Sequence, residues 1–79
     1  MDLKILKYFI AIAEELNITK AANKLKIKQP PLSSQIKKLE AELDTTLFIR
    51  GKRHLQLTDS GKLLYRYAKE IISLYEALP

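Results

Sequence analysis

The segment Gln29–Leu43 holds residues whose types and spacing suit the binding of a polyanion. At helical spacing one side of the segment is polar and basic, and no acidic residue precedes position 40. That side is formed by Pro30, Ser33, Ser34, Lys37 and Lys38. Hydroxyl groups donate hydrogen bonds to phosphate oxygens, and ammonium groups add positive charge. The segment therefore predicts a helix whose exposed face binds a polyanion.

The opposite side of the same segment is apolar. Its residues recur at steps of four, three and four, the spacing of a buried helical stripe. They are Leu32, Ile36, Leu39 and Leu43. We expect this stripe to pack on other helices, so that the basic side faces outward.

The distribution of charge supports the same interpretation. The chain of 79 residues has a formal net charge of +5. Residues 20–53 hold nine of its 14 basic residues and three of its nine acidic residues, so this part alone carries the excess. Such a concentration is typical of a domain that follows phosphates. A lysine-rich solvated surface is the alternative, and charge alone does not decide between them.

Other functional classes find little support in the composition. The chain has no Cys and only one His, His54, so we expect no disulfide, no metal site and no cofactor. No catalytic triad, phosphate loop or paired-carboxylate cleft is apparent, so we expect no enzyme and no catalytic residue. Apolar runs are far too short for a membrane span of about 20 residues. No signal peptide follows Met1, and we expect a cytoplasmic chain that begins at its natural start.

Three helices should position the basic face. The first should cover residues 4–16, with Asp2 as its N-cap. A second, short helix should start after Thr19, whose hydroxyl would cap it, and should contain two alanines that permit close helix packing. After a turn at residues 26–28, Pro30 and Pro31 suit the first turn of the third helix, which needs no backbone donors. This order matches a helix-turn-helix.

A hairpin should follow the third helix. Residues 46–49 and 55–57 form short strand-like runs around a cationic tip. Gly51 is expected to supply a turn conformation that other residues resist. A hairpin in this place is a wing, and Arg53 is the best candidate for a minor-groove contact, where narrow A·T tracts favour arginine. The predicted fold is mainly α, a winged helix-turn-helix followed by a long helix.

The long helix should start at the cap cluster of residues 58–60 and run to Leu78. One apolar row has heptad spacing and predicts a dimer seam, formed by Leu64, Tyr67, Ile71, Leu74 and Leu78. A second row should pack on the domain itself and consists of Tyr65, Ala68, Ile72 and Tyr75. The alternative is that both rows serve one intramolecular core, but so small a domain has little interior for two faces.

The chain resembles the amino-terminal DNA-binding region of LysR-type transcriptional regulators over essentially its whole length. The blocks that carry the resemblance are MDLKILKYFIAIAEE, ITKAANKLKIKQPPLSSQIKKLEAEL and TLFIRGKRHLQLTDSGKLL, in this order. The resemblance implies a winged helix-turn-helix over residues 1–57 and a linker helix over residues 58–79 that pairs antiparallel with its twin. It also implies a larger C-terminal inducer-binding domain, which is absent here, so we expect a fragment of a longer protein.

The resemblance also implies roles for individual residues. The family's major-groove positions correspond to Gln29, Pro30, Pro31, Ser33 and Ser34, while Thr19 and Arg53 would make supporting contacts. Gln can pair with adenine, and proline rings can meet thymine methyl groups. The expected phosphate contacts are Thr19, Lys28, Lys37, Lys38, Arg50 and Lys52.

Three positions depart from the family pattern. Ser34 stands where many members have arginine, so a strong guanine or phosphate contact is missing. Lys28 stands where serine often caps the third helix, so Gln29 or the prolines should set the helix start. Asp44 stands where glycine is usual, and it tolerates a left-handed backbone less well.

Two hypotheses of function result. The first is sequence-specific binding of double-stranded DNA by a homodimer at a partly palindromic operator, with a higher oligomer open to the full-length protein. The alternative is a helical coiled-coil protein-interaction module with a solubilising basic surface. The first hypothesis requires that nucleic-acid binding weakens steeply with salt concentration, and the second does not.

Overall fold

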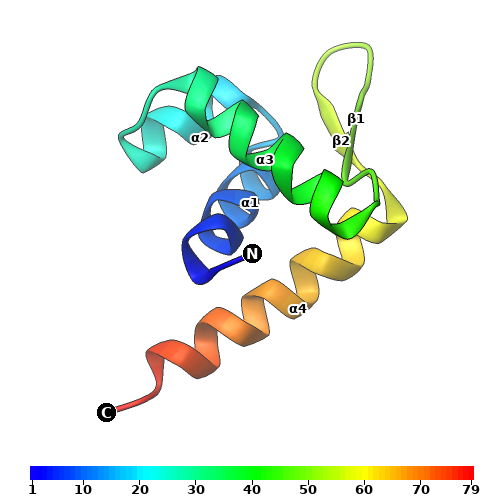
Figure 1. Cartoon of the computed structure of the whole chain (residues 1–79). Coiled ribbons are helices and arrows are strands. Elements are labelled where there is room, and N and C mark those ends of the chain that lie inside the picture. The colour runs from blue at the N-terminus through cyan, green and yellow to red at the C-terminus, as the bar shows by residue number, and fades with distance from the viewer.

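The computed structural model describes all residues from Met1 to Pro79 and is mainly helical, as predicted. Four helices and a two-stranded sheet follow one another along the chain (Figure 1). Their bounds are α1 Leu3–Glu15, α2 Ile18–Leu25, α3 Gln29–Leu43, β1 Phe48–Arg50, β2 Leu55–Leu57 and α4 Asp59–Glu76. No helix is both long and apolar enough to cross a membrane.

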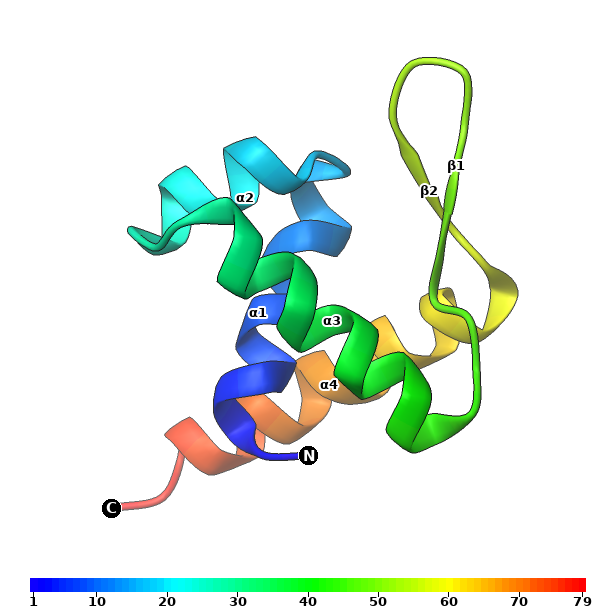
Figure 2. The ribbon, with the colours of Figure 1, turned by 45° about the horizontal axis from the view of Figure 1, so that its top comes forward.

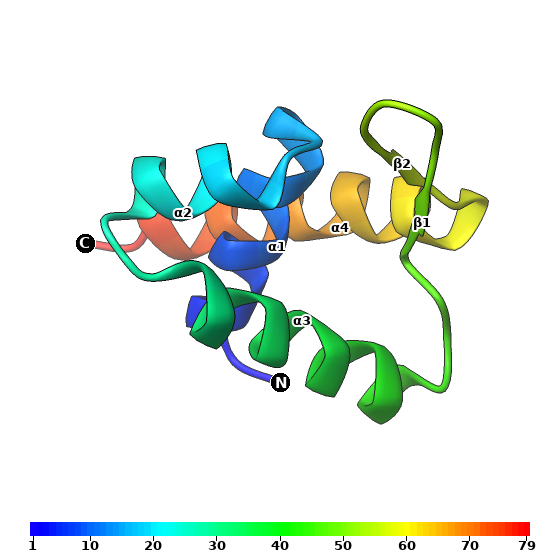
Figure 3. The ribbon, with the colours of Figure 1, turned by 90° about the horizontal axis from the view of Figure 1, so that it is seen from above.

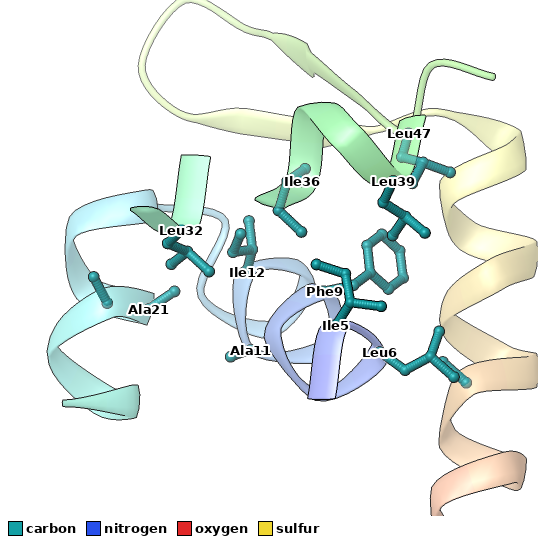
Figure 4. Close-up of a cluster of buried hydrophobic side chains, with 12 residues drawn as sticks. Ile5, Leu6, Phe9, Ala11, Ile12, Ala21, Leu32, Ile36, Leu39 and Leu47 are labelled. Atoms are coloured by element: carbon teal, nitrogen blue, oxygen red, sulfur yellow. The ribbon is translucent and has the colours of Figure 1, made fainter. Parts of the chain in front are cut away.

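Helix α1 forms the centre of the molecule, because α2, α3 and α4 all pack against it. Its N-cap is Asp2, as predicted, whose side chain accepts a 2.8 Å hydrogen bond from the backbone N–H of Ile5. Phe9 and Ile12 of α1 are fully buried. In Figure 4 the apolar side chains of α3 point toward them. The hydrophobic core therefore fixes α3 directly on α1.

Helix α2 begins earlier than predicted, and its cap is a different residue. The side chain of Asn17 accepts a 2.9 Å hydrogen bond from the backbone N–H of Lys20, so the prediction of Thr19 as the cap is wrong. The left-handed backbone of Leu16 (φ 51°) ends α1 immediately before Asn17, so that only these two residues lie between the helices. Both predicted alanines, Ala21 and Ala22, are buried. Thr19 consequently lies exposed in the first turn of α2.

The bounds predicted for α3 are confirmed, and so is most of its apolar stripe. Leu32, Ile36 and Leu39 are buried, but Leu43 is 36% exposed, so its prediction as a core residue is wrong. Leu43 lies in the last turn, where α3 extends past α1 (Figure 3). The next residue, Asp44, has the left-handed backbone expected of it, with φ 49°.

Strands β1 and β2 form the predicted hairpin, the wing, with Phe48 opposite Leu57 and Arg50 opposite Leu55. The first strand starts at Phe48 and not at residue 46, because the backbone of Leu47 bonds to other groups. Gly51 has no positive φ, so the prediction of a special turn conformation is wrong. A Cβ there would lie 2.8 Å from the carbonyl oxygen of His54, so Gly51 is needed for a close approach of the two backbones.

Helix α4 starts as predicted and ends two residues early, at Glu76. The Thr58 hydroxyl caps it by accepting a 2.9 Å hydrogen bond from the backbone N–H of Gly61. Tyr65, Ala68 and Ile72 face the core, but Tyr75 is 53% exposed, so its place in the inner row is wrong. The core ends before the last turns of α4 do.

The elements divide the molecule into two sides. In Figures 1 and 2 the wing and the start of α3 project on one side, whereas α4 and both chain termini lie on the other. The basic segment and the long apolar helix are therefore separated in space.

Candidate nucleic-acid interface

The first turn of α3 is fully available to a ligand. Gln29, Pro30 and Pro31 are exposed, and Lys28 caps the helix by backbone geometry alone, without a side-chain hydrogen bond. The prolines lack a backbone N–H, which suits this turn because its donors have no partner within a helix. Ser34 is exposed on the next turn and Ser33 is half-buried. The predicted base-reading residues thus lie together at one end of α3.

The basic residues around this turn carry free charge. Ion pairs in the structure involve the N-terminal amine, Lys7, Lys24 and Lys69, all of them paired with Glu residues. None involves the predicted phosphate-binding or wing residues, which are all exposed: Lys28, Lys37, Lys38, Arg50, Lys52 and Arg53. Because no carboxylate neutralises them, these side chains are free to contact phosphates.

A polar groove of about 250 Å³ brings the wing and the helix-turn-helix together. The start of α2 contributes Thr19, the start of α3 contributes Gln29, and the wing forms the facing wall. The wall consists of Arg50, Gly51, Lys52, Arg53, His54 and Leu55. Residues far apart in the sequence thus surround one strongly basic groove.

Two lining residues with polar side chains were not among the predicted site residues. Asn17 lies at its edge as the cap of α2, and His54 lies in the wing wall. The sequence did contain a signal for Asn17, because Asn is among the best N-cap residues. The place of His54 depends on the fold of the hairpin, which residue type alone does not reveal.

The predicted dimer seam on α4 is largely uncovered. Tyr67, Ile71, Leu74 and Leu78 are between 43% and 71% exposed. Leu64 is half-buried against the core, while Leu63, which was not predicted, is 47% exposed one turn before Tyr67. The exposed apolar row is therefore Leu63, Tyr67, Ile71 and Leu74 of α4, together with Leu78 just after the end of the helix, a set that we call the outer row.

A polar cluster ties α4 to the helix-turn-helix. The Tyr65 hydroxyl donates a 2.8 Å hydrogen bond to Glu14, and Lys69 and Lys24 approach the same carboxylate to 3.5 and 3.6 Å. The hydrogen bond from Tyr65, with help from the two ammonium groups, lowers the pKa of Glu14 despite partial burial. The same bond raises the pKa of Tyr65. The cluster thus joins α1, α2 and α4 through one carboxylate.

No group of His, Asp or Glu side chains gathers in a way that could hold a metal ion. The ionisable groups with shifted pKa values are Glu14 and Tyr65, which belong to the cluster just described and not to the groove. The groove instead has polar donors and cations around an open surface. Its chemistry is that of anion binding.

Comparison with known proteins places this arrangement in a family. Residues 3–62 match the model of the bacterial regulatory helix-turn-helix proteins of the lysR family. The chain is 49% identical over 73 residues to the HTH-type transcriptional regulator BenM of Acinetobacter baylyi, which is 92% of this chain and 24% of that protein. It spans between about a quarter and about half of the length of the curated relatives that it matches.

Solved structures of similar chains include complexes with DNA. The complex of the BenM DNA-binding domain with catB site 1 DNA has a TM-score of 0.93 at 47% identity, covering 96% of this chain and 85% of that one. The complex of the CbnR DNA-binding domain with DNA has a TM-score of 0.91 at 39% identity, covering 96% of this chain and 87% of that one. The chain therefore belongs to the LysR family of bacterial regulatory helix-turn-helix proteins, as the DNA-binding domain of a transcriptional regulator and not as an enzyme.

Proposed function

We propose that the chain binds a specific duplex DNA operator as a dimer, with α3 of each subunit in a major groove and the wing at the adjacent minor groove. The observation that carries this proposal is the basic groove between the start of α3 and the wing, with its unpaired cations. A duplex presents charged backbones on either side of each groove, so a helix and a hairpin side by side can contact both. The similar DNA-binding domains of BenM and CbnR were solved in complex with DNA, which supports DNA as the ligand.

The proposed roles follow from side-chain chemistry. Gln29 reads adenine through a pair of hydrogen bonds, and the rings of Pro30 and Pro31 meet thymine methyl groups. Ser33 and Ser34 donate to a base edge or to a phosphate. Arg53 enters the minor groove, and the remaining side chains bind phosphates: Thr19, Lys28, Lys37, Lys38, Arg50 and Lys52.

Dimerisation is proposed through the outer row of α4, which is apolar, exposed and at helical spacing. In this division residues 1–57 bind DNA and residues 58–79 join the subunits, while an inducer-binding domain would belong to the full-length regulator. Two recognition helices related by a two-fold axis read half-sites about 34 Å apart, or a multiple of this distance. The operator is then a partial palindrome.

Titration of a labelled duplex at several salt concentrations tests the proposal. The duplex would be selected from a randomised pool with this chain, and a scrambled duplex of equal length would serve as the control. Affinity for both should fall steeply with salt, by a slope of about 0.9 for each phosphate contact, and the selected duplex should bind more tightly throughout. A duplex affinity that does not change with salt concentration would favour the protein-interaction module instead.

A further inference from the structure

The side chain of Glu40 joins α3 to the first strand of the wing. Its Oε2 atom accepts hydrogen bonds from the backbone N–H groups of Leu47, at 2.7 Å, and of Phe48, at 3.2 Å. None of the ion pairs in the structure includes Glu40, although basic residues are frequent nearby. Hydrogen bonds to an ionised carboxylate are shorter and stronger than those between neutral groups. The carboxylate is therefore occupied by the backbone that leads into the wing.

We define the wing base as residues 46–48. Hydrogen bonds connect this base, or strand β2 beside it, to α3 and to residues at the ends of α1 and α4. The backbone N–H of Thr58, at the start of α4, donates to the carbonyl oxygen of Leu47 at 3.0 Å. The N–H of Leu55 in β2 donates to the carbonyl oxygen of Leu16, at the end of α1, at 3.3 Å. Glu40 makes the only hydrogen bonds between the wing base and α3, in addition to the apolar packing of Leu47 in the core that α3 shares. Its side chain can be changed without altering the backbone.

The position of the wing tip depends on this base. Each strand of the wing has three residues, and the loop from Gly51 to His54 beyond them makes no hydrogen bond to the helices. A short two-stranded ribbon has little stability of its own. Its direction relative to α3 is consequently set where it leaves the body of the domain.

We propose that Glu40 is a positioning residue for DNA binding. It fixes the direction of the wing relative to α3, so that the wing and α3 can contact the same duplex at the same time. This inference rests on the proposed function, because it assumes that the wing and α3 bind the same DNA. Without the carboxylate, the N–H groups of Leu47 and Phe48 would lose their partner, and the wing would sample a wider range of directions. Wing contacts would then form at a greater loss of conformational entropy.

The test compares Glu40→Ala with Glu42→Ala. Glu42 lies two residues further along α3, its carboxylate binds the N-terminal amine at 2.8 Å, and it forms no hydrogen bond or ion pair with the wing. Both variants remove one negative charge from the same part of α3, so the general electrostatic gain in DNA affinity is matched. Two duplexes serve as probes: the selected operator in full length, and the same operator shortened so that the DNA beneath the wings is missing.

On the full-length duplex, Glu40→Ala should bind about tenfold more weakly than Glu42→Ala, the size expected for the loss of hydrogen bonds to a charged group. On the shortened duplex the two variants should bind alike. In an Arg53→Ala background, the additional loss caused by Glu40→Ala should be smaller than in the unmodified chain, because the two changes act in part on the same wing contacts. Glu40→Gln, which keeps an acceptor oxygen, should restore part of the affinity.

A readout without DNA completes the test. Amide hydrogen exchange at Leu47 and Phe48 should become faster in Glu40→Ala and stay unchanged in Glu42→Ala. Equal losses on the long and the short duplex, or losses that add fully to those of Arg53→Ala, would overturn the positioning role while leaving DNA binding intact. If the unmodified chain itself showed no salt-dependent duplex binding, the proposed function would fail instead.

Discussion

The Tyr65 hydroxyl lies 2.8 Å from Glu14 Oε2 and donates a hydrogen bond that joins α4 to α1. Through the same carboxylate, Lys24 connects α2 to this pair. Helix α4, which we propose joins the subunits, is thus attached to the helix-turn-helix by a polar contact as well as by its apolar inner face. The polar contact between Tyr65 and Glu14 depends on pH, because the pKa of Glu14 is shifted.

Replacing Tyr65 by Phe should weaken the fold more at neutral than at acidic pH. The pKa of Glu14 is lower in the folded chain than its ordinary value, so its contribution is present above that value and is lost as the pH falls through the folded pKa. The free energy of unfolding should drop by about 0.5–1 kcal/mol at pH 7, a reduced figure because the pair is partly exposed, and by less at pH 3.

Urea denaturation followed by circular dichroism at both pH values measures this difference. Tyr8→Phe is the matched control, because the Tyr8 ring faces Lys4 of its own helix and not a carboxylate. A loss of the same size at pH 7 and pH 3 would show that the hydrogen bond to ionised Glu14 is not its source.

Replacing Gln29 by Ala should cost specificity. The variant should lose about 1–3 kcal/mol of binding free energy on the selected duplex, because the pair of hydrogen bonds to a base edge is gone. On the scrambled duplex the loss should be small. Fluorescence anisotropy with both duplexes measures the two losses, and equal losses would remove Gln29 from the base-reading set.

Replacing Lys37 by Ala should cost affinity for all sequences alike. One phosphate contact fewer should lower the slope of log affinity against log salt by about one unit. Lys7→Ala is the control, because Lys7 pairs with Glu76 in the last turn of α4, and neither residue lines the groove. The proposed phosphate contact would be refuted by an identical salt slope in the two variants.

Replacing Arg53 by Ala should weaken binding most where the flanks of the operator are rich in A·T pairs, since narrow minor grooves attract arginine. Lys52→Ala, in the same loop, should weaken A·T-rich and G·C-rich flanks equally, because it removes only a phosphate contact. Affinities of both variants for duplexes that differ only in the flanks distinguish a minor-groove contact from a phosphate contact. A loss independent of flank sequence in Arg53→Ala would place its guanidinium on the backbone.

Replacing Ile71 by Glu should give a monomer. Ile71 is 43% exposed in the middle of the outer row, and a charge there would have to be buried in the proposed interface. Ile49→Glu is the matched control, because Ile49 is 48% exposed on the wing and should leave the mass of the dimer unchanged. Analytical ultracentrifugation measures both masses, and an Ile71→Glu dimer would exclude the outer row as the interface.

Local patterns in the sequence predicted much of the fold. The start of α3 at its two prolines, the cap Asp2, a cap for α4 within residues 58–60 and the hairpin after α3 all depend on neighbouring residues, and all are confirmed. The helix-turn-helix, the wing and the family followed from their order along the chain. The wrong predictions concern positions that the backbone conformation or the packing of the folded chain decides, and residue type alone does not reveal these.

Three of these positions show why. Asn17 and Thr19 are both good caps, and the left-handed backbone at Leu16 decides in favour of Asn17. Gly51 is required by the nearby carbonyl group of His54 and not by its own φ. Leu63 and Leu64 are adjacent and chemically equal, so only the packing of α4 on the core reveals which one faces outward.

The glycines of the chain also bear on how such a domain meets its operator. Gly51 and Gly61 are the only two, and at both a side chain would collide with a backbone carbonyl oxygen. The turns between α1, α2 and α3 contain none, and left-handed Leu16 and Lys26 end the helices there. These connections thus lack the residue that most readily adopts several backbone conformations. In the proposed dimer, half-sites at unequal separations would then be matched by bending the DNA, and the sequence between the half-sites would influence affinity without being touched.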